Sequence, residues 1–415
     1  MTSATPPKGT GPLGRREARL AWGLLFPTIF IVSLVVILPL LSIFWISFKP
    51  VGLADLRTPE VVAREDLRGR PEAVGDAAEI RYRIRNSSQD APIEGVVLTD
   101  ILPEGVVLDG APPAPCVADG RALTCDFGDI EGGFRETLEI PVILQADPGA
   151  LEVAIEDSAP TVTGRADNIL TNSEFTLENF ARVFDGNEFW TVFYATMFYT
   201  IVGTIGALVF GLFAAMLLNK SFKGQGILRG LFLFPYVAPV IAVAFTWVNL
   251  FDPFSGSVNA LLIQMGVTQE SINFFGQRPL ALIMVTVFEI WRYFPLSFLF
   301  ILARMQSIDH SMYEAADMDG ASPFQKFWFL SLPQLLGILS VLFLLRFIWT
   351  FNKFDDIFLL TGGNAGTRTL TVNVYEQAFA ESNIGAGAAV AVVIFGCLLI
   401  FSYFFFRFIS REEGL

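Results

Sequence analysis

The sequence is poor in histidine, cysteine and charge. It contains one His and three Cys in 415 residues, and only 17% of its residues are charged. A zinc site draws its ligands from His, Cys and carboxylates, so these numbers argue against a metal centre. No segment fits the phosphate-binding pattern G-x-x-x-x-G-K-[ST], because the glycine-rich GGNAGTRT at 362–369 lacks the lysine. We therefore predict no catalytic zinc cluster and no phosphate-binding loop in this chain.

Apolar residues are abundant instead. They make up 53% of the chain, with 41 Phe, and the mean hydropathy is positive. A membrane-spanning helix needs about 20 consecutive apolar residues. Six stretches meet this length, at 20–48, 189–218, 228–251, 280–304, 333–352 and 386–409. The sequence thus predicts an all-α polytopic membrane protein with six transmembrane helices.

The basic residues predict the orientation of these helices, because cytoplasmic flanks are enriched in Lys and Arg. Arg15, Arg16 and Arg19 precede the first stretch, which we expect to remain in the mature protein. The N-terminus is then cytoplasmic, and so is the C-terminus after six crossings. The basic residues that follow the second, fourth and sixth stretches fall on this same side: Lys220, Lys223, Arg229, Arg304, Lys326, Arg407 and Arg411.

The acidic residues gather in the segment between the first two apolar stretches. Residues 51–188 contain 27 acidic and 11 basic side chains, a balance of −16, so the rest of the chain carries +3 within the total of −13. In the predicted orientation this segment is extracytoplasmic. An acidic segment does not favour nucleic acid, whose binding requires phosphate neutralisation.

Residues 76–146 alternate apolar and polar positions between Gly, Pro, Asn and Asp, which is typical of short strands in a β-sandwich. They resemble a small immunoglobulin-like module of bacterial surface proteins. We therefore divide the chain into 1–50, an insert at 51–175 and a membrane core at 176–415. Cys116 and Cys125 are expected to form a disulfide in this compartment, the alternative being two reduced thiols. The insert is equally well interpreted as a spacer and as a docking surface.

The segment 311–332 predicts two short helices. Ser311 and Glu314 fit a capping box, and Gly320 fits a left-handed helix stop. Ser322, Pro323 and Gln325 repeat the start signal. Local pattern alone allows either a helix that docks into a partner's groove or a helix that lies flat among lipid headgroups.

Glu314-Ala315-Ala316, then Gly320, Leu330 and Leu332-Pro333, resembles the EAA signature of binding-protein-dependent ABC importer permeases. The resemblance implies the type I permease fold and a coupling helix that sits in a cleft of a separate ATPase subunit. It further implies that this chain is a transport subunit and not an enzyme, with no catalytic residue and no bound cofactor. It also implies the partners: two ATPase copies that hold ATP and Mg²⁺, a second homologous permease and an extracytoplasmic solute-binding protein. The residues that inherit the coupling role are Glu314, Ala315, Ala316, Asp319, Gly320 and Pro333.

Other segments resemble the sugar-importing branch of that family, typified by the maltose and glycerol-phosphate permeases. They are LENFARVFDGNEFWTVFYATMFYT, ILRGLFLFPYVAPVIAVAFTW, FNKFDDIFLLTGG and LTVNVYEQAF. The resemblance implies the bacterial cytoplasmic (inner) membrane, surrounding lipid and a sugar or polyol solute. Two features depart from the family: TGGNAG, where it usually has Gly-Gly-Pro, and the acidic insert.

Charged residues inside the apolar stretches are candidates for a solute path, because ionisable groups at membrane depth face a bundle interior or a water-filled cavity. We expect Glu289 and Arg292, three residues apart on one helix face, to pair. The alternative is that these charges only neutralise one another and lock two helices together. The candidate path consists of Glu289, Arg292, Arg346, Trp349, Asn352 and Asp356, and Lys353 follows Arg346 at helical spacing.

Two other functions remain possible from the sequence. In a membrane-anchored adhesion or sensor protein, the sandwich would act and one span would suffice. A stand-alone secondary transporter would show paired, inverted broken helices, and no such internal symmetry is visible.

Overall fold

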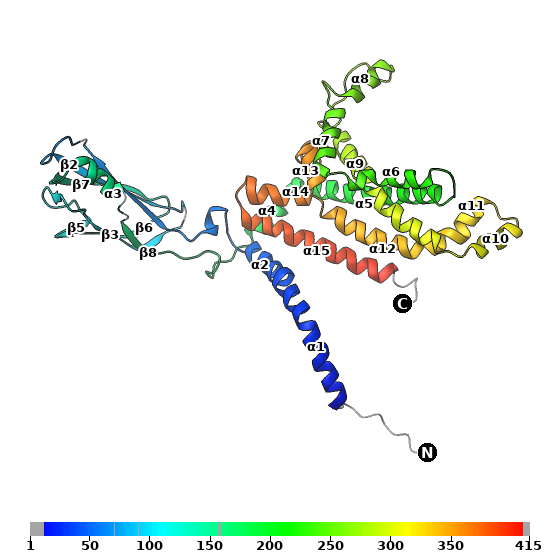
Figure 1. Cartoon of the computed structure of the whole chain (residues 1–415), viewed down its shortest axis with the longest axis horizontal. Helices are drawn as coiled ribbons and strands as arrows, with labels where there is room; N and C mark the ends of the chain where they lie inside the picture. Colours follow the sequence, from blue (N-terminus) through cyan, green and yellow to red (C-terminus); the bar gives the residue numbers. More distant parts are fainter. Residues whose placement is uncertain (1–11, 70, 90, 157, 159, 410–415) are drawn as a thin grey trace. The chain divides into compact units, whose positions relative to one another are not determined.

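The computed structural model describes residues 12–69, 71–89, 91–156, 158 and 160–409. The chain divides into two compact units, of which one is Lys49–Thr176 and the other is formed by the residues on either side of that insertion (Figure 1). The inserted unit is a β-sandwich, and the other unit is helical.

The inserted unit contains two four-stranded antiparallel sheets, with strand orders β1-β2-β7-β4 and β5-β6-β3-β8. A short helix, α3 (Pro148–Glu156), precedes the last strand. The strands are β1 (Val61–Arg68), β2 (Ala77–Asn86), β3 (Ile93–Ile101), β4 (Val106–Leu108), β5 (Cys116–Asp119), β6 (Ala122–Ile130), β7 (Arg135–Leu144) and β8 (Thr161–Arg165). Two of them, β1 and β8, lie outside the 76–146 core that the sequence predicts. Their apolar alternation is weak, since β1 turns Glu65 inward and β8 has only five residues.

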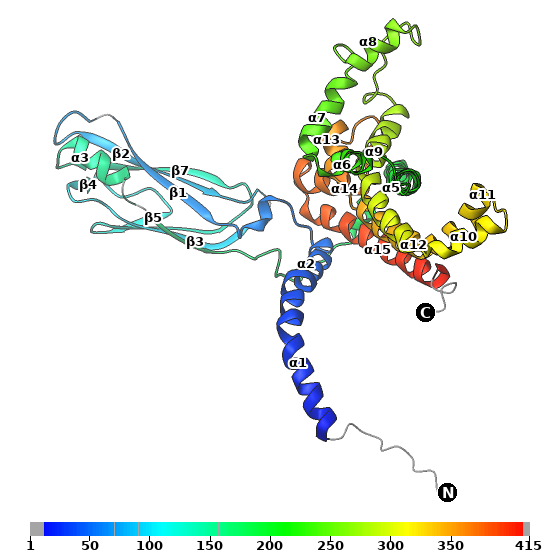
Figure 2. The same cartoon turned by 45° about the vertical axis from the view of Figure 1, so that its right-hand side comes forward.

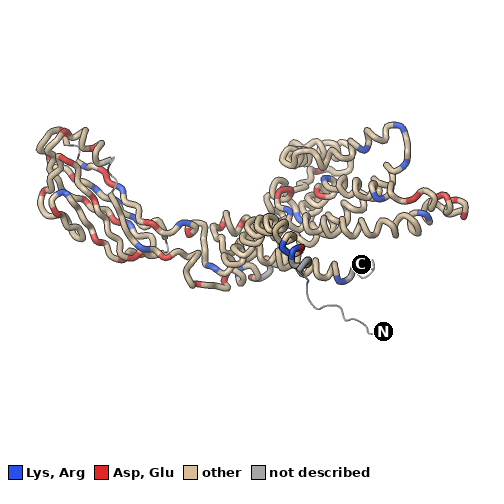
Figure 3. The backbone as a smooth tube through the Cα atoms, turned by 60° about the horizontal axis from the view of Figure 1, so that its bottom comes forward, with Lys and Arg blue, Asp and Glu red and all other residues tan. Residues whose placement is uncertain are grey.

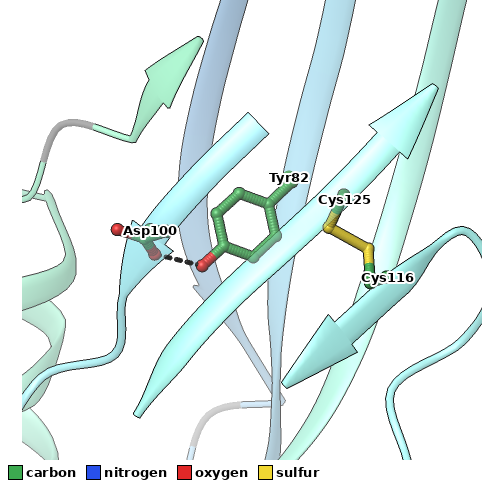
Figure 4. The surroundings of a disulfide bond; sticks show 4 residues. All are labelled: Tyr82, Asp100, Cys116 and Cys125. Carbon is green, nitrogen blue, oxygen red and sulfur yellow. Dashed lines mark hydrogen bonds between the residues drawn. A yellow bond between two sulfur atoms is a disulfide. The ribbon is translucent and has the colours of Figure 1, made fainter. Parts of the chain in front are cut away.

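Alternation along β2 builds the sandwich core, because Ile80, Tyr82 and Ile84 point inward and are almost fully buried. Every residue of that core comes from the insert. Cys116 and Cys125 stand directly opposite each other on β5 and β6 and form a disulfide (Figure 4). The same view shows Tyr82 reaching from one sheet to Asp100 on the other, to which its hydroxyl donates a hydrogen bond.

Among its described residues, the helical unit contains five continuous helical segments that are long and apolar enough to cross a bilayer: Arg16–Ser47, Glu188–Leu218, Leu280–Gln306, Pro323–Phe351 and Ile384–Arg407. The helices are α1 (Pro12–Val32), α2 (Leu38–Ser47), α4 (Glu178–Val183), α5 (Gly186–Leu218), α6 (Gln225–Val237), α7 (Val240–Leu250), α8 (Ser257–Gln264), α9 (Leu280–Gln306), α10 (His310–Met318), α11 (Pro323–Lys326), α12 (Leu332–Phe351), α13 (Asp355–Thr361), α14 (Leu370–Tyr375) and α15 (Ile384–Ile409). Arg411 lies outside the described residues, and so does the side chain of Arg15.

The predicted span at 228–251 is not one helix. It consists of α6 and α7, which meet at an angle of 90°, so the count is six only if this pair makes a single crossing. The break lies at Ala238, whose backbone is extended, immediately before Pro239. A residue before proline is biased towards extended geometry, and proline has no N–H to continue the helical ladder.

Glycines allow α5 and α9 to pack closely. A Cβ at Gly211 would lie 2.6 Å from the Cβ of Ser297, and one at Gly206 would lie 2.4 Å from the side chain of Ile290. Any larger residue would force the two helices apart. Their close approach places Tyr199 of α5 beside Glu289 of α9.

Candidate functional site

The segment with the EAA pattern forms an exposed helix pair, α10 and α11, at one end of the helical unit (Figures 1 and 2). It connects α9 to a π-helical turn, Phe327–Ser331, that leads into α12. No residue of α10 is buried. Glu314, Ala315 and Asp319 are exposed, and Ala316 is partly exposed. Pro333 stands in the first turn of α12, where proline is tolerated.

The start of α10 differs from the prediction. The N-cap is Asp309, whose carboxylate accepts a hydrogen bond from the backbone N–H of Ser311 at 2.9 Å. The predicted capping box of Ser311 and Glu314 is therefore wrong. Asp309 precedes Ser311 by two residues, and an aspartate caps at least as well as a serine. This hydrogen bond holds the pKa of Asp309 below its usual value.

The end of α10 and the start of α11 agree with the prediction. Gly320 has φ +73°, and the N–H groups of Gly320 and Ala321 donate to the carbonyls of Asp317 and Ala316. This is a Schellman stop, for which a residue without Cβ is favoured. Ser322 and Gln325 then form a reciprocal capping box. Two contacts fix the angle between the helices: Lys326 Nζ lies 2.6 Å from Asp317, and the hydroxyls of Tyr313 and Ser331 lie 2.9 Å apart.

Large apolar side chains on the helix pair and on the π-helical turn that follows it are open to solvent. Met318, Phe324 and Phe329 are 88%, 71% and 76% exposed. Exposed apolar groups of this size, beside small residues such as Ala315, are typical of a surface that another protein covers. The sequence analysis missed these three residues. No signal in the sequence distinguishes them, because apolar residues make up 53% of the chain.

Inside the helical unit, a cluster of charged side chains is almost fully buried between α5, α9 and α12. Glu289 accepts hydrogen bonds from Arg346 at 2.5 Å and from Thr350 and Tyr199 at 3.0 Å. Arg346 also lies over the ring of Tyr293, 4.4 Å from its centroid. Both partners of the Glu289–Arg346 ion pair are at most 2% exposed.

The predicted pairing of Glu289 with Arg292 is wrong. The two residues lie on adjacent sectors of α9, but Glu289 faces α5 and α12 whereas Arg292 faces the break between α6 and α7. Arg346 reaches the carboxylate of Glu289 directly from α12, whereas the side chain of Arg292 would have to fold back along α9 to reach it.

Arg292 binds backbone carbonyl groups at the break between α6 and α7. Its guanidinium donates to the carbonyls of Pro235 and Ala238, all at 3.2 Å. The carbonyl of Pro235 has lost its usual helical donor, because the residue four positions later is Pro239. A cation at the C-terminal end of α6 is also favoured by the helix dipole. Arg292 thus satisfies backbone groups that the break exposes.

Asp356 completes the cluster on α13. It is fully buried, and its carboxylate lies 4.0 Å from Arg292 Nε and 3.8 Å from Lys353 Nζ, with no hydrogen bond to either oxygen from any described residue. The structure therefore brings together four of the six predicted path residues, Glu289, Arg292, Arg346 and Asp356. The other two are exposed: Trp349 is 48% exposed, and the side chain of Asn352 donates to the carbonyl of Ile348.

Lys353 also belongs to the cluster, as do Tyr199, Tyr293 and Thr350, and these last three are not among the predicted path residues. Thr350 and Lys353 follow Arg346 at helical spacing, which is a signal in the sequence. Nothing in the sequence places Tyr199 there, because that depends on the packing of α5. Among the described residues, no group of three or more His, Cys, Asp or Glu side chains is arranged to hold a metal ion.

Comparisons with known proteins agree with this architecture. The family described as "Binding-protein-dependent transport system inner membrane component" matches residues 207–412. The inner membrane ABC transporter permease protein YcjO of Escherichia coli is 36% identical over 233 residues, which are 54% of this chain and 76% of that protein. The trehalose/maltose permease protein MalF of Thermococcus litoralis is 33% identical over 56% of this chain and 78% of its own length. The sn-glycerol-3-phosphate permease protein UgpA of Yersinia pestis is 32% identical over 58% and 82%.

A solved bacterial ABC transporter for the import of the acidic polysaccharide alginate has a similar fold. The TM-score is 0.54 at 19% sequence identity, and the match covers 59% of this chain and 86% of that one. This likeness concerns the fold alone.

Proposed function

Because the chain belongs to the family of binding-protein-dependent transport system inner membrane components, and is a permease subunit of an ABC importer, we propose that it carries a sugar or related polyol across the inner membrane. The names of its relatives support this solute class, since they include permeases for trehalose, maltose and sn-glycerol 3-phosphate. Family membership argues against a stand-alone carrier and against a protein that the spans merely anchor.

The helix pair α10–α11 is the coupling element in this proposal. Its lack of buried residues in α10, its fixed inter-helix angle and its exposed apolar side chains suit insertion into a cleft of an ATPase subunit. Glu314, Ala315, Ala316, Asp319 and Gly320 form the docking surface, and Pro333 starts the span that moves with it. The exposure of α10 at the EAA motif is the observation that carries the proposal.

The complete transporter then contains two ATPase copies, a second homologous permease and an extracytoplasmic solute-binding protein. ATP and Mg²⁺ are held by the ATPases. When the ATPases close on ATP, they draw the coupling helices together and open the cavity outward for solute delivery. Hydrolysis returns the inward-facing state.

The proposed topology has six spans, with α6 and α7 together forming the third. Both termini are cytoplasmic, and the acidic insert is extracytoplasmic. The basic residues of the described loops support this orientation, because Lys220, Lys223, Arg304 and Lys326 all fall on the side of α10–α11.

The buried cluster is the proposed solute path. Its hydroxyls, carboxylates and guanidinium groups can exchange hydrogen bonds with sugar hydroxyls when the bundle opens. Asp356 is the leading candidate, because both of its oxygens lack a hydrogen-bond partner among the described residues. Trp349 and Asn352 lie apart from the cluster and contribute only if α12 rotates.

The experiment is ATP hydrolysis by the assembled complex in proteoliposomes, compared between Gly320→Val and Gly266→Val. Both glycines have a left-handed backbone, with φ +73° and +72°, and neither has a neighbour within 4 Å of the added Cβ. The backbone strain, about 1–2 kcal/mol, is therefore equal in the two variants. We expect the Gly320→Val complex to lose ATP hydrolysis and the Gly266→Val complex to retain it. Equal activity in both would exclude α10–α11 as the coupling element.

A further inference from the structure

The outer face of the sheet β1-β2-β7 carries an uncompensated group of arginines. Arg85 of β2 stands directly opposite Arg135 of β7, and Arg64 of β1 stands directly opposite Arg83 of β2. All four side chains are exposed. Like charges directly opposite each other on neighbouring strands destabilise a sheet. We call these residues, Arg64, Arg83, Arg85 and Arg135, the arginine cluster.

The other half of the same face is arranged differently. There, Arg81 is paired with Asp66, and Arg68 is paired with Glu139. Within the arginine cluster, only Arg83 has an ion-pair partner among the described residues, and it shares Asp66 with Arg81 at 3.3 Å. The insert is strongly acidic overall, so carboxylates to neutralise the remaining three are plentiful in the sequence (Figure 3). Among the described residues, none forms an ion pair with Arg64, Arg85 or Arg135, which leaves a local positive site on an acidic module.

The arginine cluster lines a cavity of about 410 Å³, together with Val62, Ile84, Glu136 and Thr137. This volume falls in the range of small-molecule sites, about 300–1,000 Å³, and is larger than a flat protein contact would need. The guanidinium group binds carboxylates through paired, charge-assisted hydrogen bonds. Neighbouring strands lie about 4.8 Å apart, and alternate residues along a strand lie about 6.6 Å apart. The four side chains can therefore hold two or more carboxylates of one ligand.

We propose that the arginine cluster binds an acidic saccharide that carries at least two carboxylate groups. The saccharide class rests on the proposed function, because a sugar importer presents this module to sugars outside the cytoplasm. The site lies in the insert and is separate from the path through the helical unit. It holds the ligand at the surface and does not transport it.

The test is titration of the purified full-length chain, in nanodiscs at low salt, with trigalacturonate and with its uncharged methyl ester. We expect saturable binding of the acid, no binding of the ester and weakening as salt rises. The variant Arg85→Gln/Arg135→Gln should bind the acid about tenfold or more weakly, since each bond to a charged group is worth about a factor of ten. The control is Arg68→Gln/Arg121→Gln, which removes the same charge from two ion-paired arginines of the same module. It should change affinity by less than about threefold.

A folding readout accompanies the titration. Removing Arg85 and Arg135 relieves like-charge opposition, so the melting temperature of the insert should not fall and should rise slightly. Three results would overturn the proposal: no binding of the acid by the parent chain, an equal loss in the control, or tighter binding of a glutamate-rich peptide than of the saccharide. ATP-driven uptake of neutral sugars is measured in parallel. Its absence would contradict the proposed function, whereas loss of saccharide binding alone contradicts only this site.

Discussion

The helical unit and the sandwich both bury acidic side chains, and they do so in different ways. In the helical unit, Glu289 and Asp356 face the cations Arg346, Arg292 and Lys353. In the sandwich, Glu65 and Asp100 lie near each other and near Tyr82, with no cation between them. Burial, and then the charge of Asp100, raise the pKa of Glu65 to about 7.

The difference reflects the two surroundings. A residue inside a membrane bundle is far from water, so its charge is tolerated when a countercharge is packed against it. A module in water can instead keep a buried carboxyl protonated near neutral pH. The charged carboxylate in the bundle is stabilised by the cations packed against it. The protonation of the carboxyl in the sandwich depends instead on pH.

Loss of one partner of the buried ion pair should have the largest effect. Glu289→Leu leaves Arg346 buried without its carboxylate, which costs about 3–5 kcal/mol. We expect little folded chain in the membrane, measured as the fraction that remains monodisperse after mild-detergent extraction.

The double variant Glu289→Leu/Arg346→Leu sharpens this test. Replacing both charges by apolar groups should restore the folded fraction, because no charge is left unpaired. If the pair also lines the solute path, transport stays lost although the fold returns. Full transport by the double variant would show that the pair only locks helices together.

Arg292→Leu should have the next largest effect. It leaves the carbonyls of Pro235 and Ala238 without the donor and removes one of two cations near Asp356. Each buried polar group left unpaired costs about 1–3 kcal/mol. We expect a lower melting temperature of the permease complex and partial recovery with Arg292→Lys, which keeps the charge but not the planar fork. Unchanged stability of the leucine variant would refute this role.

The sandwich should respond to pH through Glu65. Its pKa is raised on folding, so the folded state binds the proton more tightly than the unfolded state does. The stabilisation is fully present below about pH 4.5 and is lost as pH rises to about 7, a change of about 1–3 kcal/mol. Urea unfolding of residues 49–176 can be followed by the fluorescence of Tyr82, the single tyrosine of that segment.

Glu65→Gln is the matched control, because it removes the titration and keeps the shape. The free energy of unfolding of the parent minus that of the variant should fall as pH rises from 4.5 to 7. A constant difference would mean that Glu65 is not the titrating group. Asp66 has a lowered pKa caused by Arg81 and acts in the opposite direction, but it is present in both proteins.

Tyr82→Phe should have the smallest effect. It removes the hydroxyl that donates to the buried Asp100 and leaves the ring in the core. The expected loss of unfolding free energy is about 1–2 kcal/mol. Urea unfolding of parent and variant, followed by circular dichroism because the variant lacks the tyrosine, tests this directly, and equal stability of the two would contradict it.

Local signals in the sequence predicted the parts of the structure that depend on local physics. Apolar length located the long helices, Gly320 and Ser322 located a helix stop and a helix start, and alternation located most of the sandwich. The wrong predictions concern contacts between helices that are far apart in the sequence. The partner of Glu289 is set by the packing of α9 against α12, and no pattern within one helix contains that rotation.

The remaining errors came from competition between similar local signals. Asp309 and Ser311 both suit an N-cap, and the first of them takes the position. The stretch 228–251 has the apolar length of one span, but Pro239 interrupts it, and at the 90° bend Arg292 satisfies the exposed carbonyls. The exposed Met318, Phe324 and Phe329 looked unremarkable next to so many apolar residues.

Coupling through the exposed helix pair is the central claim, and purification of the chain from its native membrane in mild detergent tests it most directly. We predict that an ATPase co-purifies at two copies per complex and that Glu314→Lys releases it without loss of the chain from the membrane. A chain that purifies alone and still moves solute in vesicles without ATP would contradict the account.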